Sequence, residues 1–265
     1  MSKIKKLIAA FSSIVRQPSL LNLVINNNDA RKYRHLQRYP QLEALPEITF
    51  EQLSSTPDME VEMCFLDGAS MPTDLALLKT LAQGKKSFFE IGTWRGESVW
   101  NVAKVLDDCT TLNLSAKEMN EMGLPKKYAE LHGIVSKKNS KILHLEGNSK
   151  TFDFKGLNKK YDLIFIDGDH SYEMVRNDTQ KVFEHLVHDE TVVVWHDYGY
   201  SPERVRYEVF SAILDGLSKT KHANLYHVAN TMCAVYIPNK LATRPFESLQ
   251  TPEVLFTVQM KTHKL

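Results

Sequence analysis

Cysteine is scarce in this sequence, and the few cysteines are widely separated. The 265 residues include three, Cys64, Cys109 and Cys233, and no two of them form a CxxC pair. This spacing argues against a structural zinc site and against a disulfide framework. We therefore expect a protein of a reducing compartment and predict a cytoplasmic location.

Neither sign of charge is in excess, and long apolar runs are missing. The chain has 33 Lys and Arg against 32 Asp and Glu, for a formal net charge of +1. Without a basic excess it lacks the electrostatic footprint of a protein that binds a nucleic-acid backbone. No segment approaches the ~20 apolar residues that cross a bilayer. These absences favour a small-molecule partner, and they predict no nucleic-acid binding and no membrane span.

The first residues place lysines ahead of an apolar run, as signal peptides do. Arg16 interrupts that run, and Ile4, Leu7, Ile8 and Phe11 recur at helical spacing, so an amphipathic helix is the better interpretation. Residues 1–85 as a whole show helix-like patches broken by prolines and no alternation of strands with helices. We predict a helical accessory region there, whose apolar helices are a candidate surface for a homo-oligomer.

From Lys86 onward, short apolar runs alternate with helical patterns, which is typical of a parallel sheet covered by helices on both faces. The predicted strands are 87–91, 110–114, 141–145, 163–167 and 191–195. The predicted helices are 97–106, 172–186 and 203–217, with a further helix at 72–83 and one or two within 115–140.

The end of this domain follows a different pattern. Two apolar strands, predicted at 225–228 and 233–237, are joined by a tight connection around Asn230 and Thr231 with no helix between them. That arrangement predicts an antiparallel hairpin that closes the parallel sheet. We therefore place an α/β domain at 86–238 and a C-terminal tail at 239–265.

A glycine turn follows the first strand of this domain. The strand ends at Glu90, and Gly92 and Gly96 lie in the turn that leads to the helix from 97. Glycines at the carboxyl end of a strand let a ligand approach the backbone, and the helix start offers unpaired N–H groups. Tight packing of strand against helix would require the same glycines, so the turn alone is a weak signal.

Ionisable side chains follow two later strands. Asp167 ends one strand, His196 and Asp197 end the next, and Asp169 and His170 come directly after the first. If these strands are neighbours, their carboxyl ends meet at one edge of the sheet. Carboxylates and imidazole suit a divalent cation, although aspartates also often cap helices.

These motifs together resemble a known family. The form E-x-G-x-x-x-G-x-S at 90–98 is similar to class I S-adenosylmethionine-dependent methyltransferases. The runs 167–173 (DGDHSYE) and 195–199 (WHDYG) resemble a bacterial branch that contains small-molecule and sugar O-methyltransferases and cephalosporin-hydroxylase-like proteins. The resemblance covers about 86–238. It implies a Rossmann-like, seven-stranded, mostly parallel sheet with a terminal antiparallel hairpin.

The resemblance also implies roles for individual residues. The metal ligands would be Asp167, His196 and Asp197, and the catalytic residues would be His170, Asp169 and Asp167. Asn113 and Asn148 depart from the family, which commonly has acidic residues there, so they imply weaker hydrogen bonds to the methyl donor. The residues expected to bind the donor are Glu90, Gly92, Thr93, Trp94, Gly96, Ser98, Asn113, Asn148, Ser149 and Asp167.

The function implied is methyl transfer from S-adenosyl-L-methionine to a hydroxyl of a small molecule or sugar, with a divalent cation (Mg, Mn or Ca) as a candidate cofactor. Two alternatives stay open: a metal-dependent hydrolase or oxygenase on the same fold, and a non-catalytic binding protein that has kept it. A nicotinamide-dependent oxidoreductase is disfavoured because position 94 is Trp where G-x-G-x-x-G requires glycine. The sequence does not identify the acceptor.

Overall fold

The structure is a computed structural model that describes all residues except 1, 19, 26, 54–58, 67–69 and 265. The chain divides into two compact units, Met1–Glu43 and Ala44–Leu265. This division lies about forty residues before the boundary predicted at residue 85. The reason is that residues 44–85 supply a strand and a helix to the larger unit.

The described residues of the smaller unit form three helices, α1 (Lys3–Arg16), α2 (Leu20–Ile25) and α3 (Asn28–Arg38). Side chains cap two of them: Ser2 Oγ accepts from Lys5 N, and Asn27 Oδ1 accepts from Ala30 N. The predicted amphipathic helix is thus confirmed as α1. All 14 residues of α1 are described, and none of them is buried.

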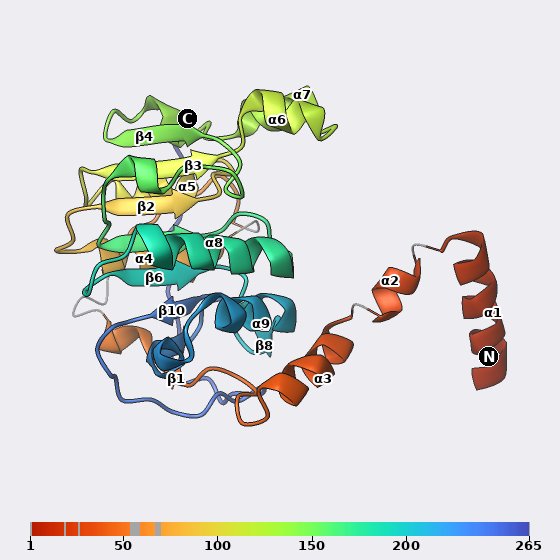
Figure 1. The fold of residues 1–265 in the computed structure, drawn as a ribbon. Coiled ribbons are helices and arrows are strands. Elements are labelled where there is room, and N and C mark those ends of the chain that lie inside the picture. Colours follow the sequence, from red (N-terminus) through yellow and green to blue (C-terminus); the bar gives the residue numbers. More distant parts are fainter. Residues whose placement is uncertain (1, 19, 26, 54–58, 67–69, 265) are drawn as a thin grey trace. The chain divides into compact units, whose positions relative to one another are not determined.

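An eight-stranded sheet forms the centre of the larger unit, in the order β1-β9-β10-β6-β5-β2-β3-β4 (Figure 1). Pairing is parallel except where β10 meets β6 and β9. The strands are β1 (Glu47–Ile48), β2 (Phe88–Ile91), β3 (Cys109–Asn113), β4 (Ile142–Glu146), β5 (Leu163–Ile166), β6 (Val192–Trp195), β9 (Leu225–Val228) and β10 (Ala234–Tyr236). The predicted α/β class, the parallel sheet and the closing hairpin are confirmed.

The eighth strand is the two-residue β1, which lies within the region predicted to be helical. It pairs in parallel with β9, placing Glu47 beside His227 and Ile48 beside Val228. Two residues are too few to show an alternating pattern, so periodicity could not reveal it.

Helices cover both faces of the sheet (Figure 1). One face carries α4 (Pro72–Ala82) and α5 (Glu97–Val102), and the other carries α8 (Tyr172–His185) and α9 (Tyr207–Gly216). Every residue of β2, β5, β6 and β9 is buried, as expected for strands covered on both sides. Between α4, α5 and the sheet, Leu77, Phe88, Val99 and Val235 belong to one apolar cluster.

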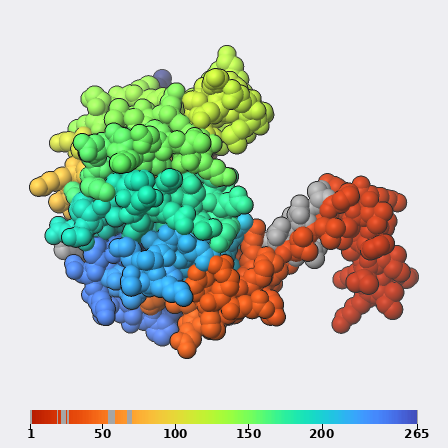
Figure 2. Space-filling view, in the orientation of Figure 1, coloured from red at the N-terminus to blue at the C-terminus, as the bar shows by residue number. Residues whose placement is uncertain are grey.

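Two segments differ from the expected elements. The helix predicted from residue 203 begins at Tyr207, because a small hairpin of β7 (Gly199–Ser201) and β8 (Arg204–Val205) precedes it. The segment 115–140 contains α6 (Ala116–Glu121) and α7 (Lys126–Leu131). These two helices lie beyond the carboxyl ends of β3 and β4 and stand out from the body of this unit (Figures 1 and 2).

The tail after β10 makes few backbone contacts. Arg244 forms an isolated antiparallel bridge with Glu47, and residues 245–264 contain no helix or strand. Among the described helices of the whole chain, none has the length and apolar character needed to cross a membrane.

Candidate active site

The carboxyl ends of β2, β5 and β6 lie side by side, as the sequence predicted. Ile91, Ile166 and Trp195 are register partners in these strands. Backbone bonds continue one residue further, because Asp167 N donates to Ile91 O at 2.8 Å and His196 N donates to Ile166 O at 3.1 Å. The side chains that follow the three strands therefore start from one edge.

His196 is the centre of a buried ion-pair cluster at this edge. Its Nδ1 lies 3.2 Å from Asp167 Oδ1 and 3.1 Å from Asp197 Oδ2, and its Nε2 lies 3.2 Å from Asp74 Oδ2. Burial disfavours the charged imidazole, but the charge of Asp167 and hydrogen bonds to all three carboxylates raise the pKa of His196 well above its usual range. The three carboxylates thus favour the charged form of His196 and engage both of its ring nitrogens.

Asp197 links this cluster to two further basic side chains. Its backbone is in the left-handed region, with φ +57, which is uncommon for a residue other than glycine. His170 Nδ1 lies 3.0 Å from Asp197 Oδ2, and Arg206 Nη1 lies 3.4 Å from Oδ1. Burial opposes ionisation, but hydrogen bonds from His170 and His196 outweigh it and hold the pKa of Asp197 well below its usual range.

The loop after β5 places His170 and Asp169 differently. The hydrogen bond to Asp197 raises the pKa of His170 against the opposing effect of burial, and its side chain is 40% exposed. Asp169 Oδ1 accepts from Ser171 N at 2.7 Å, which holds the turn before α8. His170 therefore faces both the acid cluster and solvent.

Glu90 is fully buried at the end of β2. Ser98 Oγ donates to its Oε2, Thr111 Oγ1 donates to its Oε1 at 2.8 Å, and Thr93 Oγ1 in turn contacts Thr111 Oγ1. Burial raises the pKa of Glu90 to about 8, and the charge of Asp167 adds to this although the hydroxyl bonds oppose it. Near neutral pH the Glu90 carboxyl is protonated and has its partners within the protein.

Close packing requires both glycines of the turn after β2. Gly92 has φ +97, and a Cβ there would lie 2.1 Å from the backbone oxygen of Asp167. Gly96 has φ +88, and a Cβ there would lie 2.1 Å from Ser136 Oγ. Two carbonyl oxygens of the turn also accept backbone hydrogen bonds: Trp94 O from Gly133 N, and Arg95 O from Val135 N. The glycines thus pack the turn against β5 and against the segment after α7.

The sequence of this region matches the profile of a known family. We call the side chains of Asp167, His196 and Asp197 the acid edge. Residues 89–198, which include the glycine turn and the acid edge, match a family described as a methyltransferase domain. This part of the chain is thus similar to that methyltransferase family. The resemblance predicted from the motifs is confirmed, and we refer to the region as the methyltransferase domain.

Comparison with solved structures gave several similar folds. A putative caffeoyl-CoA O-methyltransferase from Staphylococcus aureus is 18% identical, with a TM-score of 0.43, over 84% of this chain and 99% of that one. An O-methyltransferase from Bacillus cereus, solved with SAH, is 17% identical, with a TM-score of 0.42, over 82% and 95%. The YcgJ protein from Bacillus subtilis is 15% identical, with a TM-score of 0.35; the match covers 49% of this chain and about half, 53%, of YcgJ. No curated protein matches the chain.

Two asparagines and a serine expected to bind the donor lie at the carboxyl ends of β3 and β4 in the methyltransferase domain. Asn113 Oδ1 accepts from Thr93 N at 3.3 Å and so braces the glycine turn. Asn148 Oδ1 accepts from Lys150 N at 3.0 Å in a local turn. Ser149 is buried and hydrogen-bonds the carboxyl of Asp178, whose pKa burial raises. All three lie at the carboxyl edge, and each makes contacts within the protein.

Trp94, also expected at the donor, stacks on Tyr128 of α7 with ring centroids 4.6 Å apart, and His132 packs edge-on against both rings. Tyr128 is 38% exposed. The turn thus carries a flat aromatic group beneath the projecting helices.

Sequence analysis missed two charged residues of the site. Asp74, in the first turn of α4, lies far from the acid edge in sequence, and Arg206 precedes α9 after an unrecognised hairpin. An acid three residues after Met71 is an N-terminal helix signal, which explains why Asp74 would be expected to cap α4 rather than to contact His196. Arg206 Nε is buried without a hydrogen-bond partner among the described residues.

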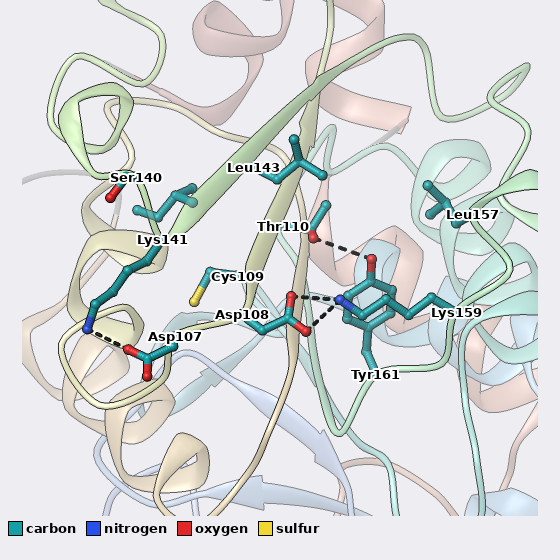
Figure 3. A pocket seen from close by; sticks show the side chains of 11 residues that line it. Asp107, Asp108, Cys109, Thr110, Ser140, Lys141, Leu143, Leu157, Lys159 and Tyr161 are labelled. Carbon is teal, nitrogen blue, oxygen red and sulfur yellow. Dashed lines mark hydrogen bonds and ion pairs between the residues drawn. The ribbon is translucent and has the colours of Figure 1, made fainter.

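A separate cavity of about 530 Å³ lies at the opposite edge of the sheet, where β3 and β4 begin (Figure 3). Its charged walls are paired, Lys141 with Asp107 at 2.6 Å and Lys159 with Asp108 at 2.6 Å. None of the predicted site residues lines it.

The contact between Gly96 and Ser136 can be tested by alanine substitution. We expect Gly96→Ala to lower the free energy of unfolding by about 2 kcal/mol, since it combines a left-handed backbone with overlap on Ser136. Gly123→Ala is the matched control, because Gly123 also has a positive φ, +77, but has no atom within 4 Å of the added Cβ. It should cost about 1 kcal/mol.

Denaturant unfolding of both variants measures the difference. Adding Ser136→Ala to Gly96→Ala should recover part of the loss. Equal costs at Gly96 and Gly123, with no recovery, would show that Ser136 does not restrict position 96.

Proposed function

We propose that this chain is an S-adenosylmethionine-dependent methyltransferase that acts on a hydroxyl group of a small molecule or sugar. The observation that supports this best is the methyltransferase family match over 89–198. The matched residues include Asp167 and Asp197, which meet at the carboxyl edge of the sheet, where ligands of open α/β sheets bind.

The residues at this edge fit the chemistry of the methyl donor. When bound, S-adenosylmethionine supplies a methyl group on a positively charged sulfur, beside an ammonium and an adenine ring. Asp167 offers a carboxylate that is 18% exposed next to the glycine turn, and Trp94 with Tyr128 offers an aromatic surface. Burial favours the protonated form of Glu90 near neutral pH, so we assign the ammonium to Asp167 rather than to Glu90.

Catalysis would rest mainly on positioning. A donor and an acceptor held in line at one rigid edge react as a single unit, which can remove roughly 7–11 kcal/mol of barrier. His170, joined to Asp197 and partly exposed, is placed to accept the proton of the acceptor hydroxyl in its neutral form. The projecting helices α6 and α7 would form part of the acceptor site.

A divalent cation fits the same edge. The ligand atoms of Asp167, His170 and Asp197 all lie within 4.8 Å of one another, and such a set suits magnesium or manganese. His196 was the third ligand expected from the sequence, but in the structure its nitrogens face carboxylates, so His170 is the better third ligand. With a cation bound, His170 would hold the cation and would not also accept the proton. A cation there would lower the pKa of the acceptor hydroxyl.

Ligand binding tests the proposed donor. S-adenosylhomocysteine at about a hundred times its Kd should add about 2.7 kcal/mol of stability, seen as a raised melting temperature. By calorimetry, Asp167→Asn should weaken S-adenosylmethionine binding by about tenfold or more. It should weaken binding of the product, S-adenosylhomocysteine, to a similar extent, because the product keeps the ammonium assigned to Asp167.

Asp189→Asn is the matched control, since Asp189 is exposed before β6, at the other end of the strands. It should leave both affinities unchanged. If neither nucleoside stabilises the wild-type protein, the proposed function is wrong. If a chelator and added Mg²⁺ or Mn²⁺ change neither melting nor nucleoside affinity, the cation is not part of the site.

A further inference from the structure

Helix α1 exposes a continuous apolar face. We define this face as the side chains of Ile4, Leu7, Ile8, Phe11 and Val15, which recur at helical spacing. They are 71%, 75%, 64%, 70% and 64% exposed. In α2, Leu21 and Ile25 add further exposed apolar surface. Contiguous apolar surface of this kind marks a site of association with another molecule or with a lipid surface.

Basic side chains border the apolar face on both sides. Lys3 and Lys5 flank Ile4 in sequence, so at about 100° per residue they project to either side of it. Lys6 and Arg16 complete the set. Residues 1–28 contain four basic residues and no Asp or Glu, whereas the whole chain has a net charge of +1. Positive charge is thus concentrated beside the apolar face.

This combination fits a lipid bilayer that carries negative charge. At 1.5 Å per residue, the 14 residues of α1 extend about 21 Å, which is too short to span the ~30 Å hydrocarbon core. A helix of this kind can lie in the interface, with its apolar side among the acyl chains and its lysines extended to anionic headgroups. A second copy of α1 would instead bring like charges together.

We propose that α1 binds the chain to the surface of an anionic lipid bilayer, with the apolar face of α1 inserted at the headgroup level. This inference does not depend on the proposed methyl transfer. It concerns where the protein binds, whereas the proposed function concerns what the acid edge binds.

Co-sedimentation of the full chain with vesicles tests the proposal. The vesicles contain either equal parts of phosphatidylcholine and phosphatidylglycerol or phosphatidylcholine alone, and no nucleoside is added. We expect partitioning to be about tenfold or more stronger on the anionic vesicles and to weaken in high salt. Substituting Leu7→Ser with Phe11→Ser should reduce partitioning by about tenfold or more.

Removing charge from α1 and from a control site distinguishes vesicle binding through α1 from a general effect of positive charge. Lys3→Gln, Lys5→Gln and Lys6→Gln together should also reduce partitioning by about tenfold or more. The matched control is Lys117→Gln, Lys126→Gln and Lys127→Gln, which removes the same charge from exposed positions on α6 and α7. It should bind vesicles like the wild type.

Three results would overturn the proposal: no binding of the wild type to anionic vesicles, equal binding to both vesicles, or equal losses in the α1 and control charge variants. Because α1 has no buried residue, its variants should melt like the wild type and keep the same response to S-adenosylhomocysteine. Concentration-dependent dimerisation that Phe11→Ser abolishes, without vesicle binding, would assign the apolar face of α1 to a second copy of the chain.

Discussion

Replacing Asp74 with alanine is expected to lower the free energy of unfolding by about 3–5 kcal/mol, because it leaves several buried donors, including Nε2 of His196, without their acceptor. Asp74 is fully buried, and four donors face its carboxylate. Oδ2 accepts from Met71 N at 2.8 Å and lies 3.2 Å from His196 Nε2. Oδ1 accepts from Met232 N at 2.8 Å and faces Cys233 Sγ at 3.6 Å. The side chain therefore joins α4, the start of β10 and the acid edge.

Asp74→Asn is expected to recover little of this loss. Every group that faces the carboxylate is a donor, so the amide NH₂ of asparagine would meet another donor whichever way it turned. The matched control is Asp108→Ala, which removes an aspartate paired with Lys159 that is 49% exposed; such surface pairs contribute about 0–1 kcal/mol. Urea unfolding of the three variants measures how much free energy of unfolding each one loses. A loss in Asp74→Ala no larger than in Asp108→Ala would contradict the prediction.

Glu90→Gln is expected to stabilise the protein by roughly 2–4 kcal/mol at pH 8 and to have little effect at pH 5. In the unfolded chain this carboxyl loses its proton near its ordinary pKa of 4.5, whereas in the folded protein it keeps the proton to about pH 8. Between these values the folded state binds more protons. Stability of the wild type therefore falls as pH rises through this window and levels off above it.

Glutamine avoids this fall in stability with pH because it has no proton to release. The hydroxyls of Ser98 and Thr111 can rotate to accept hydrogen bonds from its NH₂. The matched control is Glu190→Gln, an exposed position where the same change of charge should give no comparable dependence on pH. Denaturant unfolding at pH 5 and pH 8 measures the difference. If the glutamine variant is less stable than the wild type at pH 8, Glu90 is ionised in the folded protein.

The parts of the fold with strong local patterns could be predicted from the sequence. The buried strands β2, β5 and β6 are short apolar runs rich in Val, Ile and Phe, and each was predicted to within one residue at either end. Parallel pairing of these strands then predicts Asp167, His196 and Asp197 at one edge, where the structure has them. The closing hairpin was also confirmed.

What the sequence could not show depends on contacts between distant residues. Asp74 meets His196 across 122 positions, and nothing local in α4 distinguishes a capping acid from one that pairs with a buried histidine. Glu90 was predicted to bind the methyl donor, but it is buried, and its hydroxyl partners Thr111 and Ser98 come from β3 and α5. Likewise, the glycine pattern gave no indication that Gly92 packs on the Asp167 backbone.

That contact between main chains has a mechanical consequence. With the carbonyl of Asp167 against Gly92, and with Asp167 N bonded to Ile91 O, the turn after β2 and the acid edge after β5 are fixed to each other by backbone atoms. A side-chain rotation cannot change their separation. Any adjustment to acceptors of different size must therefore come from the outer elements of the proposed site, above all α6 and α7. The turn after β2 and the acid edge would stay rigid while these two helices move.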